Sequence, residues 1–442
     1  MAEFRVTNAT QLSSALSQAT GGDIIKLASG NYGSFGFKNY NFTSPVTVIS
    51  EDAGNLASFN NLEVRSSKNL SLVSLDVGRP LAAGEPDFTK MAAAFDSTNI
   101  TFDRIRFHGS LDGDPTNDGR GLHVSNVTGL VLKDSSFEQL RIGLIVERSN
   151  LVKIVGNDVH DIALDGFEIA GTNNLVVDGN TFDRFFPLAG DHPDAIQLFN
   201  TNMPTGSSNI TITNNVMLQT AGKGPQGIFI SDPGTFGFTN VLVKNNLLYG
   251  NEQYNGITVK GGRGVAIVDN TVLSKEGDAA SFWIRLQDTD NVLVQNNLTE
   301  DIVVLTGVTK LALVDNVNLK VTPWEKAGLN LISPSEVAHL MRSDVGYGSA
   351  AVQSAAPVSS AAGNSLGALF GTPIGGASLS ETLDFSGLEE SAISSDVIGV
   401  RADSLDPAFP HLSPLPDFSG HDAHIGPMFG SRYIPEHFVA IP

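Results

Sequence analysis

The chain has 442 residues, a formal net charge of −20 and no cysteine. The lack of cysteine excludes disulfides, cysteine nucleophiles and thiolate metal sites. The acidic balance argues against a nucleic-acid partner, because phosphate recognition needs a basic face. No run of about 20 apolar residues is present, which argues against a membrane-spanning segment. We expect an extracellular or secreted protein, free or associated with a cell or phage surface, and the sequence leaves its oligomeric state open.

The N-terminal residues 1–22 are predicted to form a cap. Within them Asn8 is followed by Gln11 three residues later, which is a pattern typical of a helix start. A helix here would cover the unpaired strand edge that the end of an open solenoid exposes. The apolar residues that would face the solenoid are Leu12, Ala15, Leu16 and Ala19.

A short motif of alternating apolar residues that ends in asparagine recurs along residues 23–320. Strict alternation predicts a strand with one buried face. Strands that recur without helices between them fit a solenoid in which each strand lies on its predecessor. We therefore predict an all-β fold, a right-handed parallel β-helix, over residues 23–320. The clearest copies are LVVDGN (175–180), ITITNN (210–215), VLVKNN (241–246), VAIVDN (265–270), VLVQNN (292–297) and LALVDN (311–316).

The asparagines that close these motifs are predicted to stack at one turn of the solenoid. Their amides can hydrogen-bond from coil to coil, and asparagine tolerates the left-handed backbone that such turns need. We interpret these residues as architecture rather than as a site. They are Asn157, Asn180, Asn215, Asn246, Asn270, Asn297 and Asn316.

A second strand is expected in each coil, from GLHVS (121–125) to WIRLQ (283–287). Its first, third and fifth residues are expected to point outward, because side chains alternate across a strand. The first outward column runs from Gly121 through glycine or alanine to Trp283. It predicts either a smooth trough for a ligand, with Trp283 as a flat face for a sugar ring, or a bend that glycine eases.

The other outward columns carry the reactive side chains. Lys260 and Arg285 fall on consecutive coils, where two cations repel each other unless an anion or an acid offsets them; solvated surface charges are the plain alternative. The junction 190–197 brings together His192, Asp194 and Gln197, one coil after Asp165 and Glu168. Such acids can split their pKa values and serve as acid and base, or they can form a ladder that binds backbone amides. Asp232 is a further candidate for substrate binding.

Beyond residue 320 the repeat is lost. Residues 321–442 are expected to form an irregular region that packs on the solenoid or trails from it.

With the coils assigned, the chain resembles carbohydrate-active right-handed β-helix proteins. GGDIIKLASGNYG (21–33) is similar to the opening coil of the alginate lyase and chondroitinase B family. The resemblance implies a polysaccharide lyase that cleaves an acidic, uronate-containing, alginate-like polysaccharide by β-elimination. It implies Lys260 as the base and Arg285 as the carboxylate stabiliser, with His192 and Asp194 beside them as catalytic residues. Glu168, Gln197, Asp165, Asp232 and Trp283 would bind the substrate. No cofactor is certain; calcium stays open, because Gln253 and Asn255 stand where the family has acidic ligands.

Other functions remain open on the sequence. A glycoside hydrolase would use two of Asp165, Glu168, Asp191 and Asp194, and a uronate epimerase is a related possibility. A glycan-binding solenoid without activity, such as a tailspike or an adhesin, is the non-enzymatic alternative.

Overall fold

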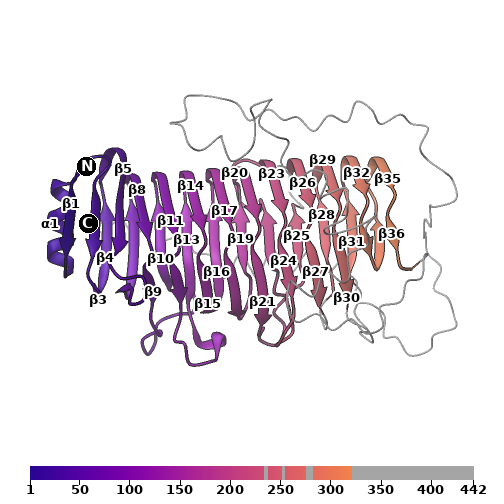
Figure 1. The fold of residues 1–442 in the computed structure, drawn as a ribbon. Coiled ribbons are helices and arrows are strands. Elements are labelled where there is room, and N and C mark those ends of the chain that lie inside the picture. Colours follow the sequence, from indigo (N-terminus) through magenta and orange to yellow (C-terminus); the bar gives the residue numbers. More distant parts are fainter. Residues whose placement is uncertain (233–236, 251–253, 275–281, 321–442) are drawn as a thin grey trace, which may run out of the picture. The chain divides into compact units, whose positions relative to one another are not determined.

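The computed structural model describes residues 1–232, 237–250, 254–274 and 282–320. These residues form a right-handed parallel β-helix, in which each coil passes through three strands that belong to three parallel sheets (Figure 1). The predicted fold is therefore confirmed. The predictions for residues 321–442 and for Gln253 lie outside the described residues.

The three sheets run along the coils, and every strand pairs in parallel with those of the neighbouring coils. Sheet A contains β1 (Glu3–Val6), β2 (Ile24–Leu27), β5 (Asn41–Ser50), β8 (Lys68–Val73), β11 (Thr98–Asp103), β14 (Thr128–Lys133), β17 (Asn150–Val155), β20 (Asn173–Asp178), β23 (Ser207–Thr213), β26 (Phe238–Lys244), β29 (Gly262–Val268), β32 (Asp290–Gln295) and β35 (Thr309–Val314). Sheet B contains β3 (Gly30–Asn31), β6 (Ala57–Phe59), β9 (Asp76–Gly78), β12 (Arg106–His108), β15 (Ser136–Leu140), β18 (Asp158–Ile162), β21 (Thr181–Phe185), β24 (Val216–Leu218), β27 (Leu247–Gly250), β30 (Thr271–Ser274), β33 (Leu298–Thr299) and β36 (Val317–Asn318). Sheet C contains β4 (Ser34–Lys38), β7 (Asn61–Arg65), β10 (Lys90–Phe95), β13 (Arg120–Ser125), β16 (Ile142–Glu147), β19 (Phe167–Ala170), β22 (Ile196–Phe199), β25 (Ile228–Ser231), β28 (Ile257–Lys260), β31 (Trp283–Gln287) and β34 (Asp301–Val304).

The core follows from the alternation in the sequence. In β32, Val292 and Val294 point inward and are fully buried, while their neighbours along the strand are partly exposed. Val292 lies level with Val265 on one neighbouring coil and with Leu311 on the other. Each coil therefore stacks apolar side chains on those of the next, and burial of each such side chain contributes roughly 1.5–3 kcal/mol.

The predicted asparagine ladder forms at the turn between sheets A and B. The Asn180 side-chain nitrogen donates to the Asn215 oxygen at 2.9 Å, and Asn215 donates in the same way to Asn246 at 2.9 Å. The backbone N–H of each of these residues donates to the same oxygen. The ladder is continuous from Asn157 to Asn316, so it satisfies buried polar groups that the turn would otherwise strand.

The residue before each ladder position adopts a left-handed backbone. Asn214, Asn245 and Asp269 have φ angles of 57°, 55° and 58°. Asparagine, aspartate and glycine tolerate this conformation, which explains why these residues precede the closing asparagine in the repeat.

The N-terminal helix also forms, as α1 (Ala9–Gln18). The Asn8 side chain caps it by accepting a hydrogen bond of 3.0 Å from the Gln11 N–H. Leu12, Ala15 and Leu16 are buried in the first coils. The loops that precede β10 and β13 extend away from the coils, drawn in purple below β9 and β15 in Figure 1, and the second contains the short 3-10 helix η1 (Pro115–Asn117).

Candidate active site on the outer face of sheet C

The outer face of sheet C has the register that the sequence predicted. Two columns of side chains point outward along it, and each member lies level with its neighbours on the adjacent coils. One column is His123, Ile145, Glu168, Gln197, Phe229, Thr258 and Arg285; the other is Ser125, Glu147, Ala170, Phe199, Ser231, Lys260 and Gln287.

The two predicted catalytic cations lie on neighbouring strands of this wall. Arg285 is level with Thr258, and Lys260 is level with Gln287, so the two cations are offset by two positions along the strand. The Arg285 guanidinium donates to the Gln287 side-chain oxygen at 3.2 Å. Lys260 is only 8% exposed, which places its amine within the wall rather than free in solvent.

A cluster of buried carboxyl groups occupies the middle of the wall. Asp165, Glu168 and Asp194 are 4%, 9% and 3% exposed. The Asp194 backbone N–H donates to Asp165 Oδ1 at 2.7 Å, and the Gln197 amide donates to Asp194 Oδ2 at 3.1 Å. Asp165 thus binds a backbone amide, as the ladder interpretation expects, and the acid–base role of these carboxyls stays a prediction.

Burial governs the protonation of this cluster. It raises the pKa of Asp165 well above the usual range, and the charges of Glu168 and Asp194 raise it further. Burial likewise raises the pKa of Asp194 well above its usual range. Burial also raises the pKa of Glu168, although the Arg120 charge opposes this effect. Carboxyl groups that keep a proton near neutral pH can act as general acids.

His192 lies close to residues of later coils. The Tyr254 hydroxyl is 3.5 Å from His192 Nδ1, and the Tyr254 and Trp283 rings are 6.3 Å apart. Burial raises the pKa of Tyr254, and the Asp194 charge adds to this effect. Sequence reasoning missed Tyr254, which precedes its strand, although an aromatic hydroxyl beside the wall could have drawn attention to it.

Two other acids that the sequence singled out have structural partners. Asp191 pairs with the buried Arg141 at 2.8 Å. Asp232 follows β25, and its carboxylate accepts a hydrogen bond of 2.5 Å from the backbone of Gly237. Asp232 therefore stabilises the turn toward sheet A, and the structure does not place it in the carboxyl cluster.

The glycine column is not an outward trough. A Cβ added at Gly121 would lie 2.3 Å from the Gly143 oxygen and 3.1 Å from the core ring of Phe137. At Gly166 it would lie 2.6 Å from the Ala195 oxygen. These glycines allow close stacking of successive coils, and this packing leaves no open trough at Gly121 and Gly166. Trp283 is the exception, because its half-buried ring lies beside Tyr254.

The described residues contain no group of three or more His, Asp or Glu that could hold a metal ion. The Asn255 oxygen accepts a hydrogen bond from the Thr258 hydroxyl. Gln253, the other position at which the family has an acidic ligand, lies outside the described residues.

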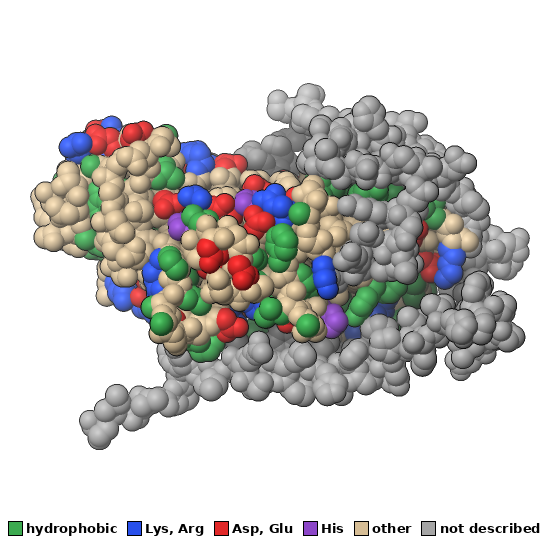
Figure 2. All heavy atoms as spheres, turned by 90° about the horizontal axis from the view of Figure 1, so that it is seen from below, with side chains coloured by type: hydrophobic (Ala, Val, Ile, Leu, Met, Phe, Trp, Pro, Cys, Tyr) green, Lys and Arg blue, Asp and Glu red, His purple; other side chains and the backbone are tan. Residues whose placement is uncertain are grey.

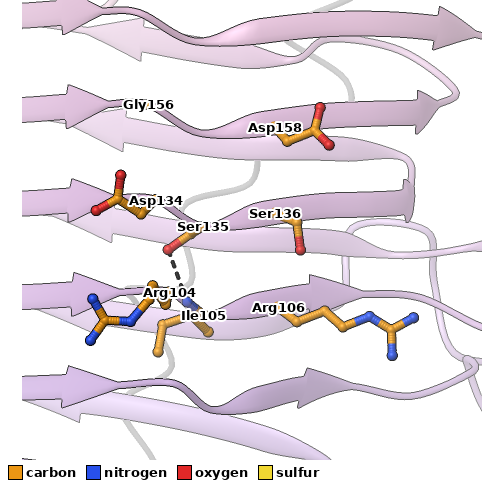
Figure 3. A pocket seen from close by; sticks show the side chains of 8 residues that line it. All are labelled: Arg104, Ile105, Arg106, Asp134, Ser135, Ser136, Gly156 and Asp158. Carbon is orange, nitrogen blue, oxygen red and sulfur yellow. Dashed lines mark hydrogen bonds between the residues drawn. The ribbon is translucent and has the colours of Figure 1, made fainter. Parts of the chain in front are cut away.

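A cavity of about 200 Å³ lies elsewhere, at the corner between sheets A and B (Figure 3). Arg104 and Arg106 line it, but each already pairs with an acid, Arg104 with Asp103 at 3.0 Å and Arg106 with Glu138. None of its lining residues belongs to sheet C.

Comparison with known proteins agrees with the fold. A family model described as "Right handed beta helix region" matches residues 90–224. A search of curated protein sequences finds no match. No helix among the described residues is long and apolar enough to cross a membrane.

Solved structures with similar coils include an alginate lyase from Paenibacillus sp. str. FPU-7, at 16% identity and a TM-score of 0.44, covering 72% of this chain and 99% of that one. The A-module of the mannuronan C-5 epimerase AlgE6 from Azotobacter vinelandii is 15% identical, with a TM-score of 0.42 and coverage of 70% and 90%. The surface adhesin PfbA of Streptococcus pneumoniae is 11% identical, with a TM-score of 0.41 and coverage of 70% and 95%. Because these structures include two enzymes and an adhesin, they do not assign one activity to this chain.

Proposed function

We propose that this protein is a carbohydrate-active enzyme that cleaves an acidic polysaccharide by β-elimination on the outer face of sheet C. The observation that carries the proposal is the register, which sets Lys260 and Arg285 on neighbouring strands of the wall that also holds Asp194. Lys260 is two strand spacings from the Asp194 coil, about 10 Å along the wall. One sugar unit with its neighbours can therefore contact both groups.

The chemistry divides among these side chains. The Arg285 guanidinium neutralises the uronate carboxylate, which makes the C5 proton removable. The Lys260 amine takes that proton as the base, and the electron pair forms the new C4–C5 double bond as the C4–O bond breaks. A buried acid supplies a proton to the departing oxygen; Asp194, and Tyr254 next to His192, are the candidates for this role.

Hydrolysis is the second candidate, and the carboxyl cluster favours it. Asp165, Glu168 and Asp194 have raised pKa values and lie together. A glycoside hydrolase uses a protonated carboxyl on the leaving oxygen and a second carboxylate as base or nucleophile. In this case Glu168, on which the Arg120 charge acts against the effect of burial, would be the ionised partner.

One assay separates the two reactions. The protein is incubated with alginate, pectate and a neutral glucan, and ultraviolet absorbance and reducing ends are followed together. Elimination raises both signals, because its product contains a double bond conjugated to the carboxylate, whereas hydrolysis raises reducing ends alone. New reducing ends without ultraviolet absorbance would show hydrolysis rather than β-elimination. No change in either signal with any acidic polymer would contradict both reactions.

A further inference from the structure

We infer that Lys90 and Arg120 form a separate oxyanion-binding subsite on the same wall, which holds a carboxylate or sulfate of the glycan several units from the point of cleavage. The identification of the ligand as a glycan rests on the proposed function. The subsite itself rests on the charges and contacts described next.

The two cations are stacked on neighbouring coils. Lys90 on β10 is the register partner of Arg120 on β13, so their backbones are about 5 Å apart. The Arg120 N–H donates to the Thr89 oxygen at 2.7 Å, which fixes the start of this strand. Both residues are half-buried, and like charges on neighbouring strands repel each other unless an anion lies between them.

Glu63 and Asp191 pair with other cations, and Glu168 is the acid on which the Arg120 charge acts. Glu63 pairs with Lys38 at 2.8 Å and also with Arg65. Asp191 pairs with Arg141 at 2.8 Å. Figure 2 shows acidic and basic side chains interspersed on one face of the described coils, so neutralising partners are abundant in this acidic protein.

Lys90 and Arg120 do not share in this pairing. Among residues 1–232 and the other described ranges, neither side chain makes an ion pair. Arg120 Nε is buried without a hydrogen-bond partner in the structure. The Arg120 charge acts on Glu168, but no ion pair within 4.0 Å joins the two. A buried, unsatisfied donor on a cation is costly, and an oxyanion of a ligand that meets the partly exposed part of the Arg120 side chain would offset its charge.

Aromatic rings border the pair. Lys90 Nζ lies 5.2 Å from the centre of the Phe95 ring, and the His123 ring meets the same ring edge-on at 5.3 Å. This cation–π contact orients the amine without neutralising it. Phe88, two residues before Lys90, is 51% exposed. An exposed ring next to unneutralised cations suits an acidic sugar, which has an apolar ring face and an anionic substituent.

The positions of the two cation pairs on the wall determine how long a ligand must be to contact both pairs. From β13 to β28 the wall spans five strand spacings, about 24 Å. The carboxyl cluster lies between, so cations flank it at both ends: Lys90 and Arg120 on one side, Lys260 and Arg285 on the other. A polyanionic chain lying along the wall would be held on both sides of the central acids.

The test is a binding measurement on the full chain. Titration calorimetry at low salt would use three hexasaccharide probes: oligomannuronate, chondroitin sulfate and cellohexaose. Lys90→Gln and Arg120→Gln are each expected to weaken binding of an acidic probe about tenfold, equivalent to one lost charged hydrogen bond. Binding of the neutral probe should not change, and Lys90→Arg should keep the affinity. Loss of affinity for oligomannuronate identifies the oxyanion as a carboxylate, whereas a loss confined to chondroitin sulfate, which carries both groups, identifies it as a sulfate.

Two controls separate the possible causes. Lys310→Gln removes a charge from sheet A, where the side chain is 73% exposed, and should leave binding unchanged. Thermal unfolding of each variant reports any loss of folding, and Lys90→Arg reports on charge alone. Affinities within twofold of the parent chain for both acidic probes would overturn the subsite. If the variants lose binding but no polymer is ever cleaved, the proposed reaction fails and the subsite stands.

Discussion

Asp165 Oδ1 accepts a hydrogen bond of 2.7 Å from the backbone N–H of Asp194, so the two carboxyl groups are held on consecutive coils of one wall. The contact explains why these acids tolerate burial, because a backbone donor offsets part of the desolvation cost of Asp165. The remaining cost raises the pKa values of both groups. The same arrangement that stabilises the turn thereby favours the protonated form of both carboxyls.

The carboxyl cluster should control the pH dependence of cleavage. Glu168→Gln removes one titrating group at nearly constant size, and we expect kcat to fall by about 10²–10³ if Glu168 transfers a proton in the reaction. Because its pKa is raised in the folded chain, the acidic limb of the pH–rate profile should also move in the variant. Glu51→Gln, on an acid that pairs with Arg5, is the matched control. An unchanged profile for Glu168→Gln would remove this residue from the mechanism.

Lys260 should matter far more for elimination than for binding. Lys260→Ala is expected to reduce the rate of ultraviolet-absorbing product at least about 10²-fold, since it removes the proposed base. Binding of an acidic hexasaccharide should weaken by much less. Lys310→Ala, on sheet A, is the control for loss of a surface lysine. Retention of full eliminase activity by Lys260→Ala would show that another group takes the proton.

The sequence predicted sheets A and C well because both carry long alternating patterns. It missed sheet B, whose strands include Ala57–Phe59 and Val216–Leu218. Three residues are too few to show alternation, and these strands can be recognised only once their coils are stacked.

The sequence predicted those parts of the candidate site that depend on strand register alone. Aligning the apolar positions correctly placed Glu168, Gln197, Lys260 and Arg285 on one face. The glycine column was misassigned because the alternation rule was extended to residues such as Gly256, which precede the start of their strands. There the chain turns a corner and alternation does not hold.

The sequence alone does not show how deeply each candidate side chain is buried. The raised pKa of Asp165 depends on solvent exclusion by neighbouring coils and loops, and Tyr254 reaches His192 only through a loop conformation. Neither relation is encoded in a local pattern, because each depends on how segments far apart in the chain meet.

The asparagine ladder should make a large contribution to stability. Asn215→Ala removes hydrogen bonds to Asn180, Asn246 and the Val177 oxygen, and Asn215 is fully buried. Donors left unsatisfied in the neighbouring coils cost about 1–3 kcal/mol each, so we expect the free energy of unfolding to fall by roughly 2–4 kcal/mol. Urea unfolding followed by circular dichroism measures the loss. The exposed Asn41→Ala is the control, and an equal effect from both would argue against the ladder.

Asp118 should make stability depend on pH in a defined window. It is fully buried, and its carboxylate oxygens accept hydrogen bonds from the Ser110 N–H at 2.6 Å and hydroxyl at 3.0 Å. Burial nevertheless raises the pKa of Asp118 to about 6. Between its unfolded pKa near 4 and this value the folded chain binds more protons than the unfolded chain. Stability from this group is therefore present below pH of about 4 and declines as the pH rises to about 6.

Asp118→Asn should abolish the part of the loss of stability with rising pH that Asp118 causes. The amide keeps an oxygen for the Ser110 N–H but does not ionise, so the variant should gain up to about 3 kcal/mol relative to the parent chain between pH of about 4 and 7. Urea unfolding at several pH values gives the difference between the two curves, which cancels the contributions of Asp165 and Asp194. Asp134→Asn, at an exposed site, controls for loss of one negative charge. Parallel curves for the parent chain and Asp118→Asn would show that Asp118 is ionised in the folded protein throughout this range.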